Sequence, residues 1–235
     1  MGREAIILAG GKGTRLQPLV SDRPKPMALI NSKPFLYYLL NHLSKNNFKH
    51  IILAVGFKHE LIYEFFGNKF KEVKISYAVE KKPLGTGGAI LNALKLAQNH
   101  CSFILNGDTY FPVAFEQMEK LSIEKNSDLI LALRELNDVS RYGTISLNKS
   151  KKVIDFIEKK GEPSSGFING GIYYLRNLSL KSLTFPKVFS FENDYLAKHN
   201  HSQNFYGEIF KDYFIDIGIP ETFKQAQSDF FTFED

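Results

Sequence analysis

The sequence predicts an α/β protein in which helices flank a mostly parallel sheet. Short apolar runs alternate with amphipathic stretches through the first half of the chain. Strand–helix–strand repeats of this kind form right-handed crossovers in a parallel sheet. No Gly-, Ser- or Pro-rich linker and no internal repeat interrupts the 235 residues, a length that suits one domain.

The first half supplies the parallel strands. The run at residues 4–9 is short, apolar and ends in glycines, which is typical of a buried strand. Pro34 suits the first turn of a helix, and Leu36, Leu39, Leu40 and Leu43 follow it at helical spacing. We then expect strands over 50–55, 73–79, 102–105 and 129–133, and helices over 59–66, 87–98 and 115–124.

The second half is richer in strands, at 143–147, 153–158, 167–175 and 213–217, and a closing helix is expected over 220–230. We interpret these as additions to the same sheet and not as a separate domain. The complete prediction is a Rossmann-like, doubly wound, mixed but mostly parallel sheet with a small lobe from the second half.

Composition narrows the class of protein. Apolar residues make up 43% of the chain and charged residues 23%, as in soluble globular proteins. A single cysteine, Cys101, excludes an intramolecular disulfide and fits a reducing compartment. The apolar run at 5–9 is too short for a signal peptide, and no window approaches a membrane span. We therefore expect a soluble, cytoplasmic protein.

The net charge is +5, and the lysines are spread along the chain. No long basic run, basic amphipathic helix or nucleic-acid signature is present, so neither nucleic acid nor a membrane is an expected partner. Phosphorylated small molecules explain the charge more simply.

A glycine-rich loop directly after the first strand is the strongest signal. It reads Leu8-Ala9-Gly10-Gly11-Lys12-Gly13-Thr14-Arg15-Leu16. Glycines at this place let backbone N–H groups approach an anion, while Thr14 adds a hydroxyl and Arg15 can grip phosphate oxygens. A dinucleotide fingerprint would need glycine at position 16, and a P-loop would need Ser or Thr after Gly11-Lys12. Both common phosphate motifs are thus excluded.

The loop, followed by Pro24-Lys25-Pro26-Met27, resembles the signature of the sugar-phosphate nucleotidyltransferases. Further segments match in order: Glu80 with Pro83-Leu84-Gly85-Thr86-Gly87-Gly88-Ala89, Asn106-Gly107-Asp108, Ile168-Asn169-Gly170-Gly171-Ile172-Tyr173 and Asp216-Ile217-Gly218-Ile219-Pro220. The resemblance spans nearly the whole chain and is closest to the D-glycero-α-D-manno-heptose 1-phosphate guanylyltransferases. Ile219 departs from it, because many members carry Thr there.

This resemblance implies an enzyme that transfers GMP from GTP to a heptose 1-phosphate, giving GDP-heptose and pyrophosphate for bacterial surface polysaccharides. Residues 1–110 would mainly bind the nucleotide, and residues 111–235 would mainly bind the sugar phosphate and close the site. Alternatives within the class use UTP, dTTP or CTP, or act on mannose, glucose or N-acetylmuramate 1-phosphate. A non-enzymatic alternative is a regulatory module that binds nucleotide sugars.

Nucleotidyl transfer brings two anionic reactants together, so its site must supply positive charge and positioning. Arg15, Lys25 and Asp108 are the expected catalytic residues. Asp108 and Asp216, each close to a glycine and at a strand end, would hold Mg²⁺ through carboxylate oxygens. Lys25 lies between two prolines, so we expect a stiff, non-helical segment that aims it at the α-phosphate.

The resemblance also assigns the two substrate sites. The expected nucleotide-binding residues are Leu8, Ala9, Gly10, Gly11, Gly13, Thr14, Arg15, Lys25, Glu80, Pro83, Gly85, Thr86, Gly107 and Asp108. The expected sugar-phosphate residues are Asn106, Gly143, Glu158, Lys159, Asn169 and Gly170. From the sequence alone, residues 158–160 are equally well a charged turn. The sequences of the loops at 164–167 and 184–193 do not indicate which sugar is bound.

Glu80 offers the one physical clue to the base. A carboxylate only accepts hydrogen bonds, and guanine presents two adjacent donors, N1–H and the N2 amino group. Uracil and thymine present one donor between two acceptors. Glu80 therefore favours GTP. The alternative is that Glu80 is a solvated residue beside Lys81 and Lys82. The oligomeric state stays open, a homo-oligomer included.

Overall fold

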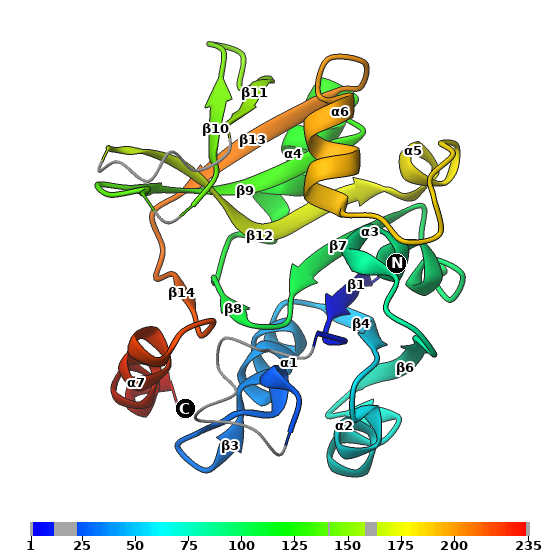
Figure 1. The fold of residues 1–235 in the computed structure, drawn as a ribbon, viewed down its shortest axis with the longest axis vertical. Helices are drawn as coiled ribbons and strands as arrows, with labels where there is room; N and C mark the ends of the chain where they lie inside the picture. The colour runs from blue at the N-terminus through cyan, green and yellow to red at the C-terminus, as the bar shows by residue number, and fades with distance from the viewer. Residues whose placement is uncertain (1, 12–22, 141, 158–163, 234–235) are drawn as a thin grey trace.

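We describe residues 2–11, 23–140, 142–157 and 164–233, from a computed structural model. Within these ranges one sheet contains ten strands (Figure 1). Eight follow in the order β11-β10-β12-β7-β1-β4-β6-β5, β9 pairs with β12, and β13 pairs with β9. Their bounds are β1 Arg3–Leu8, β4 Phe48–Val55, β5 Lys69–Phe70, β6 Val73–Val79, β7 Cys101–Asn106, β9 Leu129–Leu136, β10 Thr144–Leu147, β11 Val153–Ile157, β12 Gly166–Arg176 and β13 Phe205–Phe210.

The predicted α/β class is confirmed, with a mixed sheet around a parallel centre. β1 is parallel to both β4 and β7, and β4 is parallel to β6. β12 runs antiparallel to β7 and to β9, while β13 is parallel to β9. The second half of the chain therefore extends the same sheet, as its strand-rich pattern indicates.

Helices cover both faces of the sheet. They are α1 Phe35–Lys45, α2 His59–Phe66, α3 Gly85–Ala93, α4 Phe115–Lys125, α5 Asn177–Lys181, α6 Ala197–His199 and α7 Pro220–Asp229. Short elements complete the fold: the 3₁₀ turns η1 Lys25–Met27 and η3 Phe230–Phe233, the π-helical turn η2 Phe191–Leu196, and the strand pairs β2 Leu29–Ile30 with β3 Lys33–Pro34 and β8 Thr109–Tyr110 with β14 Ile215–Asp216.

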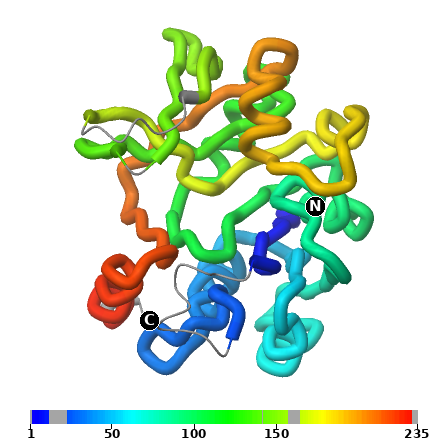
Figure 2. Tube along the Cα trace, viewed as in Figure 1, coloured from blue at the N-terminus to red at the C-terminus, as the bar shows by residue number. Residues whose placement is uncertain are grey.

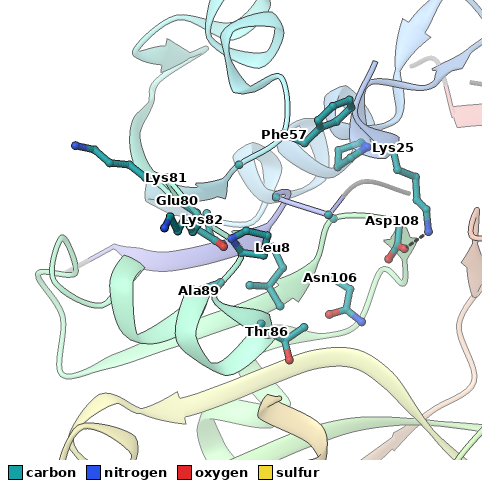
Figure 3. A pocket seen from close by; sticks show the side chains of 18 of the residues that line it. Leu8, Lys25, Phe57, Glu80, Lys81, Lys82, Thr86, Ala89, Asn106 and Asp108 are labelled. Atoms are coloured by element: carbon teal, nitrogen blue, oxygen red, sulfur yellow. Dashed lines mark hydrogen bonds and ion pairs between the residues drawn. The ribbon is translucent and has the colours of Figure 1, made fainter. Parts of the chain in front are cut away.

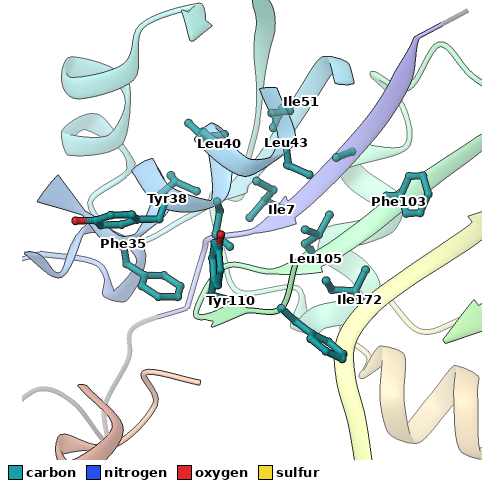
Figure 4. Close-up of a cluster of buried hydrophobic side chains, with 14 of the residues drawn as sticks. Ile7, Phe35, Tyr38, Leu40, Leu43, Ile51, Phe103, Leu105, Tyr110 and Ile172 are labelled. Atoms are coloured by element: carbon teal, nitrogen blue, oxygen red, sulfur yellow. The ribbon is translucent and has the colours of Figure 1, made fainter. Parts of the chain in front are cut away.

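Each face of the sheet has its own apolar core, because side chains alternate along a strand. Ile7 of β1 packs with α1, α4 and the C-terminal elements in one core (Figure 4). Its neighbour Ile6 packs with α3 and η2 in the other. Both isoleucines are fully buried, as expected for a parallel strand covered on both faces.

The end of the chain returns to its beginning, as the trace in Figure 2 shows. The ring of Phe230 lies 5.8 Å from that of Phe35 and 4.7 Å from that of Tyr38, both in α1. Gln227 of α7 donates to the backbone oxygen of Leu29 at 2.8 Å. These contacts anchor α7, and with it the preceding strand β14, against the first half of the chain.

Several predicted elements differ from the observed ones. The segment around Lys25, expected to be non-helical, is a 3₁₀ turn, because Pro26 occupies the first turn, where no N–H is needed. The helix expected over 87–98 is α3, which begins at Gly85 and ends at Ala93. The strand expected over 213–217 shrinks to Ile215–Asp216, since its partner β8 is two residues long. Strand β13 was not predicted, because Gly207 and Glu208 interrupt its apolar run.

No helix in the described ranges combines the length and the apolar character that crossing a bilayer requires.

Candidate active site

A cavity of about 580 Å³ lies where the parallel strands β1, β4, β6 and β7 end (Figure 3). Three lining residues, Leu8, Ala54 and Asn106, lie within the last two residues of β1, β4 and β7. Glu80 lines the cavity directly after the end of β6. Ligands bind at the carboxyl ends of the strands in open α/β sheets. The fold therefore places the cavity where the sequence predicted the site.

Most of the predicted nucleotide-binding residues within the described ranges line this cavity. They are Leu8, Gly10, Gly11, Lys25, Glu80, Pro83, Gly85, Thr86, Gly107 and Asp108. Ala9 does not: its side chain is buried in the core, and its N–H donates to the carbonyl of Ala54 at 2.8 Å. Gly13, Thr14 and Arg15 lie outside the described residues, as do Glu158 and Lys159, so their roles stay predictions.

Two glycines that line the cavity allow close contacts between backbone segments. The N–H of Gly107 donates to the carbonyl of Leu8 at 3.0 Å, and a Cβ at Gly107 would lie 2.5 Å from that oxygen. Gly85 has φ +74°, and a Cβ there would lie 2.3 Å from the carbonyl oxygen of Phe189. A larger residue at either position would displace the backbone it faces, so both close contacts depend on glycine.

Glu80 presents a carboxylate to the cavity directly after β6. Its Oε2 accepts a hydrogen bond from the N–H of Leu84 at 3.0 Å. Burial raises the pKa of Glu80, and the Leu84 N–H partly opposes this by stabilising the charged form. The side chain is half-buried and lines the cavity, so it is not simply a solvated neighbour of Lys81 and Lys82.

Lys25 and Asp108 form an ion pair on the opposite side of the cavity. Nζ of Lys25 lies 2.7 Å from Oδ2 of Asp108, with the Lys25 side chain 10% exposed and the Asp108 side chain 29% exposed. The 3₁₀ turn η1 positions the lysine, and the end of β7 positions the aspartate. A lysine this well covered needs an anionic partner, so the pair fixes a cation at the cavity wall.

Asp216 reaches the same region through a strand pairing. In β14 it is opposite Thr109 of β8, and the N–H of Ile217 donates to the carbonyl of Asp108 at 2.9 Å. Asp216 Oδ1 accepts from the N–H of Gly218 at 2.5 Å. The pairing thus places Asp216 opposite the residue that follows Asp108, the other predicted metal ligand.

These two carboxylates fit Mg²⁺. Among the described residues no cluster of three or more His, Cys, Asp or Glu side chains could form a metal cage. Magnesium is ordinarily held by one or two carboxylates, with substrate phosphates and water completing its shell. Asp108 lines the cavity beside Lys25, and Asp216, which is not part of that lining, would supply the second carboxylate.

The predicted sugar residues Asn106 and Asn169 both lie next to Gly171, in a bulge of β12. Asn169 Nδ2 donates to the hydroxyl of Tyr173 at 2.6 Å, and its Oδ1 accepts from the N–H of Gly171 at 3.1 Å. Gly171 has φ +71°, and a Cβ there would lie 2.6 Å from Nδ2 of Asn106. The bulge therefore brings Asn169 close to the cavity wall formed by Asn106.

The two predicted sugar-site glycines, Gly170 and Gly143, lie in β12 and directly before β10. A Cβ at Gly170 would lie 2.6 Å from the ring of Phe111, so the glycine permits close packing. Gly143 directly precedes β10, whose Thr144 is opposite Ile168 of β12. Neither glycine lines the cavity of Figure 3.

Sequence reasoning did not assign eight of the lining residues, which are Pro26, Ala54, Gly56, Phe57, Lys81, Lys82, Ala89 and Glu192. Gly56 follows β4 as Gly10 follows β1, and a Cβ at Gly10 would lie 3.2 Å from the Gly56 nitrogen. A glycine directly after a buried strand was a usable signal for Gly56, and the adjacent Phe57 follows from it. Ala89 belongs to the resembling segment Pro83–Ala89. Glu192 had no such signal, because only the tertiary fold brings η2 to the cavity.

The fold and the cavity together define an α/β nucleotide-binding transferase. The cavity has glycine-rich strand ends, the Glu80 carboxylate on one side and the Lys25–Asp108 ion pair on another. A nucleoside triphosphate and a second anionic substrate need such positive charge and positioning. The chain belongs to the nucleotidyl transferase family, which matches residues 4–232.

Two curated relatives cover nearly the whole chain. A D-glycero-α-D-manno-heptose 1-phosphate guanylyltransferase from Aneurinibacillus thermoaerophilus is 44% identical over 226 residues, which are 96% of this chain and 97% of the relative. An enzyme of the same description from Campylobacter jejuni is 44% identical over 94% of this chain and 96% of its own. The crystal structure of HddC from Yersinia pseudotuberculosis complexed with GMP-PN aligns with a TM-score of 0.86, 37% identity and coverage of 98% of this chain and 100% of that one.

Proposed function

We propose that the protein is a guanylyltransferase that converts GTP and D-glycero-α-D-manno-heptose 1-phosphate into GDP-heptose and pyrophosphate. Glu80 carries the choice of base. Its carboxylate lines the cavity and accepts only, so it matches the N1–H and N2 amino donors of guanine. The relatives described as heptose 1-phosphate guanylyltransferases, each at 44% identity, support the same pair of substrates.

In the proposed reaction an oxygen of the sugar phosphate attacks the α-phosphorus of GTP. The new P–O bond forms as the bond to the leaving pyrophosphate breaks, and the nucleophile is already an anion, so little proton transfer is needed. Lys25, held by Asp108, places positive charge beside the reacting phosphates. Arg15 would steady the pyrophosphate, as the sequence predicts.

We include Mg²⁺ as the cofactor, held by Asp108 and Asp216. When bound there, it would neutralise phosphate charge and help align the two substrates. Asn106 and Asn169 would contact the sugar, while Lys159 and Glu158 keep the roles predicted from the sequence. The product would serve bacterial surface polysaccharides, such as capsule or lipopolysaccharide. We propose that the enzyme acts in the cytoplasm, because a single cysteine fits a reducing compartment.

A matrix of GTP, UTP, dTTP and CTP against heptose, mannose, glucose and N-acetylmuramate 1-phosphates, scored by pyrophosphate release, tests this proposal. We expect the GTP and heptose combination to give the highest kcat/KM and a chelator to abolish turnover. Highest turnover with another triphosphate or another sugar would assign the enzyme to one of the other members of its class. No turnover with any pair would favour the regulatory nucleotide-sugar-binding module.

A further inference from the structure

One wall of the cavity is formed by Glu192, on the π-helical turn η2. Its Oε2 accepts from the hydroxyl of Thr86 at 2.7 Å and from the hydroxyl of Ser190 at 3.0 Å. Thr86 also accepts from the N–H of Phe191 at 2.8 Å. The Thr86 hydroxyl thus connects the first turn of α3 to the turn that carries Glu192.

The same carboxylate lies close to the sugar side of the site. Burial raises the pKa of Tyr173, and the negative charge of Glu192 raises it further. The Tyr173 hydroxyl is the atom to which Asn169 donates at 2.6 Å. Phe191, the residue before Glu192, packs against Tyr173 with ring centroids 5.1 Å apart. The turn η2 therefore contacts both Thr86 and the Asn169–Tyr173 pair.

Glu192 has an acceptor left for a ligand. Both hydroxyl donors contact Oε2, and no hydrogen bond within the described ranges involves Oε1. Its carboxylate is polar, charged and part of the cavity wall. Single turns of π-helix are frequent at functional sites. Here the π-helical turn η2 carries Glu192 and continues directly into α6.

We propose that Glu192 binds a hydroxyl group of the sugar 1-phosphate and thereby contributes to the choice of sugar. The proposal rests on the proposed function in that a sugar phosphate is the second substrate. A carboxylate accepts hydrogen bonds only, and the ring and side-chain hydroxyls of a sugar are donors. The turn η2 packs against Tyr173, the partner of the proposed sugar residue Asn169, so a sugar hydroxyl is favoured over the base.

The variant Glu192→Gln keeps the size of the side chain and removes its charge. Asp194→Asn is the matched control, because Asp194 belongs to the same turn, accepts from the N–H of Ser190 at 2.8 Å and does not line the cavity. Thr86→Val removes the anchoring hydroxyl, and Thr86→Ser restores it. Steady-state kinetics with GTP and the sugar 1-phosphate varied independently separate the two Michaelis constants.

We expect Glu192→Gln to raise KM for the sugar 1-phosphate about tenfold or more and to leave KM for GTP within about twofold, since a charged hydrogen bond is lost on one substrate only. Thr86→Val should raise the sugar KM by less, and Thr86→Ser should restore it. Asp194→Asn should leave both constants near the wild-type values. An equal rise in KM for GTP, unchanged constants, or the same effect in Asp194→Asn would overturn the proposal.

Monodeoxy analogues of the sugar 1-phosphate give a test that needs no variant to fold. In the wild type, the analogue that lacks the bound hydroxyl should lose about tenfold or more in kcat/KM, and in Glu192→Gln that loss should shrink for that analogue alone. If the wild type has the same kcat/KM for every deoxy analogue as for the parent sugar 1-phosphate, no sugar hydroxyl is bound specifically and the proposal is wrong. The panel is built on whichever sugar the wild type accepts, so failure of the heptose assignment is seen separately.

Discussion

The base preference is the most specific consequence of the cavity. Replacing Glu80 by Gln changes a single oxygen to an amide nitrogen, so the volume of the cavity is preserved. We expect this substitution to reduce the preference for GTP over UTP by about 10- to 100-fold, mainly through weaker use of GTP.

The backbone of Leu84 determines the direction of the effect. Its N–H donates to Oε2 of Glu80 at 3.0 Å. In Glu80→Gln the amide oxygen must take that hydrogen bond, because an NH₂ group facing an N–H would leave both donors without an acceptor. The amide NH₂ group then faces the cavity, where it opposes the guanine donors and suits a carbonyl oxygen of uracil.

The magnitude follows from the hydrogen bonds that change. A hydrogen bond to a charged group contributes roughly 1.5–3 kcal/mol, and about 1.4 kcal/mol corresponds to a factor of ten. Loss of one such bond to guanine therefore gives a 10- to 100-fold change. Burial raises the pKa of Glu80, so the wild type should also lose affinity for GTP on the acid side as the carboxylate becomes protonated.

Competition between GTP and UTP in one reaction gives the ratio of kcat/KM directly, for the wild type, for Glu80→Gln and for Glu64→Gln. Glu64 is exposed on α2 and away from the cavity, so its substitution should change nothing. A wild type that uses UTP as well as GTP, or an unchanged ratio in Glu80→Gln, would refute the proposed role of Glu80.

Three further predictions concern charge. Asp108→Asn should lower kcat at least ~100-fold while circular dichroism shows the fold intact, because it removes one Mg²⁺ ligand and the charged partner of Lys25; near-normal turnover in a metal titration would exclude this residue from the metal site. Lys159→Ala should chiefly raise KM for the sugar phosphate, whereas Arg15→Ala should chiefly lower kcat; effects of both on triphosphate affinity alone would contradict the assignment. Burial acts to raise the pKa of Glu4, but hydrogen bonds, first among them that with His50 at 2.8 Å, outweigh it, and the folded pKa lies below 4.5. The stabilisation is therefore fully present above pH 4.5 and is lost as pH falls through the folded pKa, so urea unfolding of Glu4→Gln should show a weaker acid dependence than the wild type.

Much of the fold was predictable because the parallel strands are apolar on both faces. The runs around Ile6, Ile52 and Ile104 have few polar interruptions, and each is followed by glycine or by a polar residue that ends the strand. Short pairings were not predictable in the same way. Strand β14 has only Ile215 and Asp216 because its length is set by its partner β8, which no local pattern reveals.

The site was predictable where glycines and carboxylates follow strands. Gly107 and Asp108 could be placed from β7 alone, and Glu80 from β6. Glu192 could not, because its position depends on a hydrogen bond to Thr86, 106 residues earlier in the chain. The Lys25–Asp108 pair likewise joins residues 83 positions apart, so the sequence indicated both charges but not their contact.

We propose that this cavity selects GTP and a heptose 1-phosphate. Equimolar GTP, UTP, dTTP and CTP incubated with D-glycero-α-D-manno-heptose 1-phosphate and Mg²⁺, with the nucleotide sugars resolved by mass spectrometry, test it most directly. We predict GDP-heptose as the dominant product, formed together with one pyrophosphate per turnover. A dominant UDP-, dTDP- or CDP-heptose, or no nucleotide sugar at all, would contradict the account.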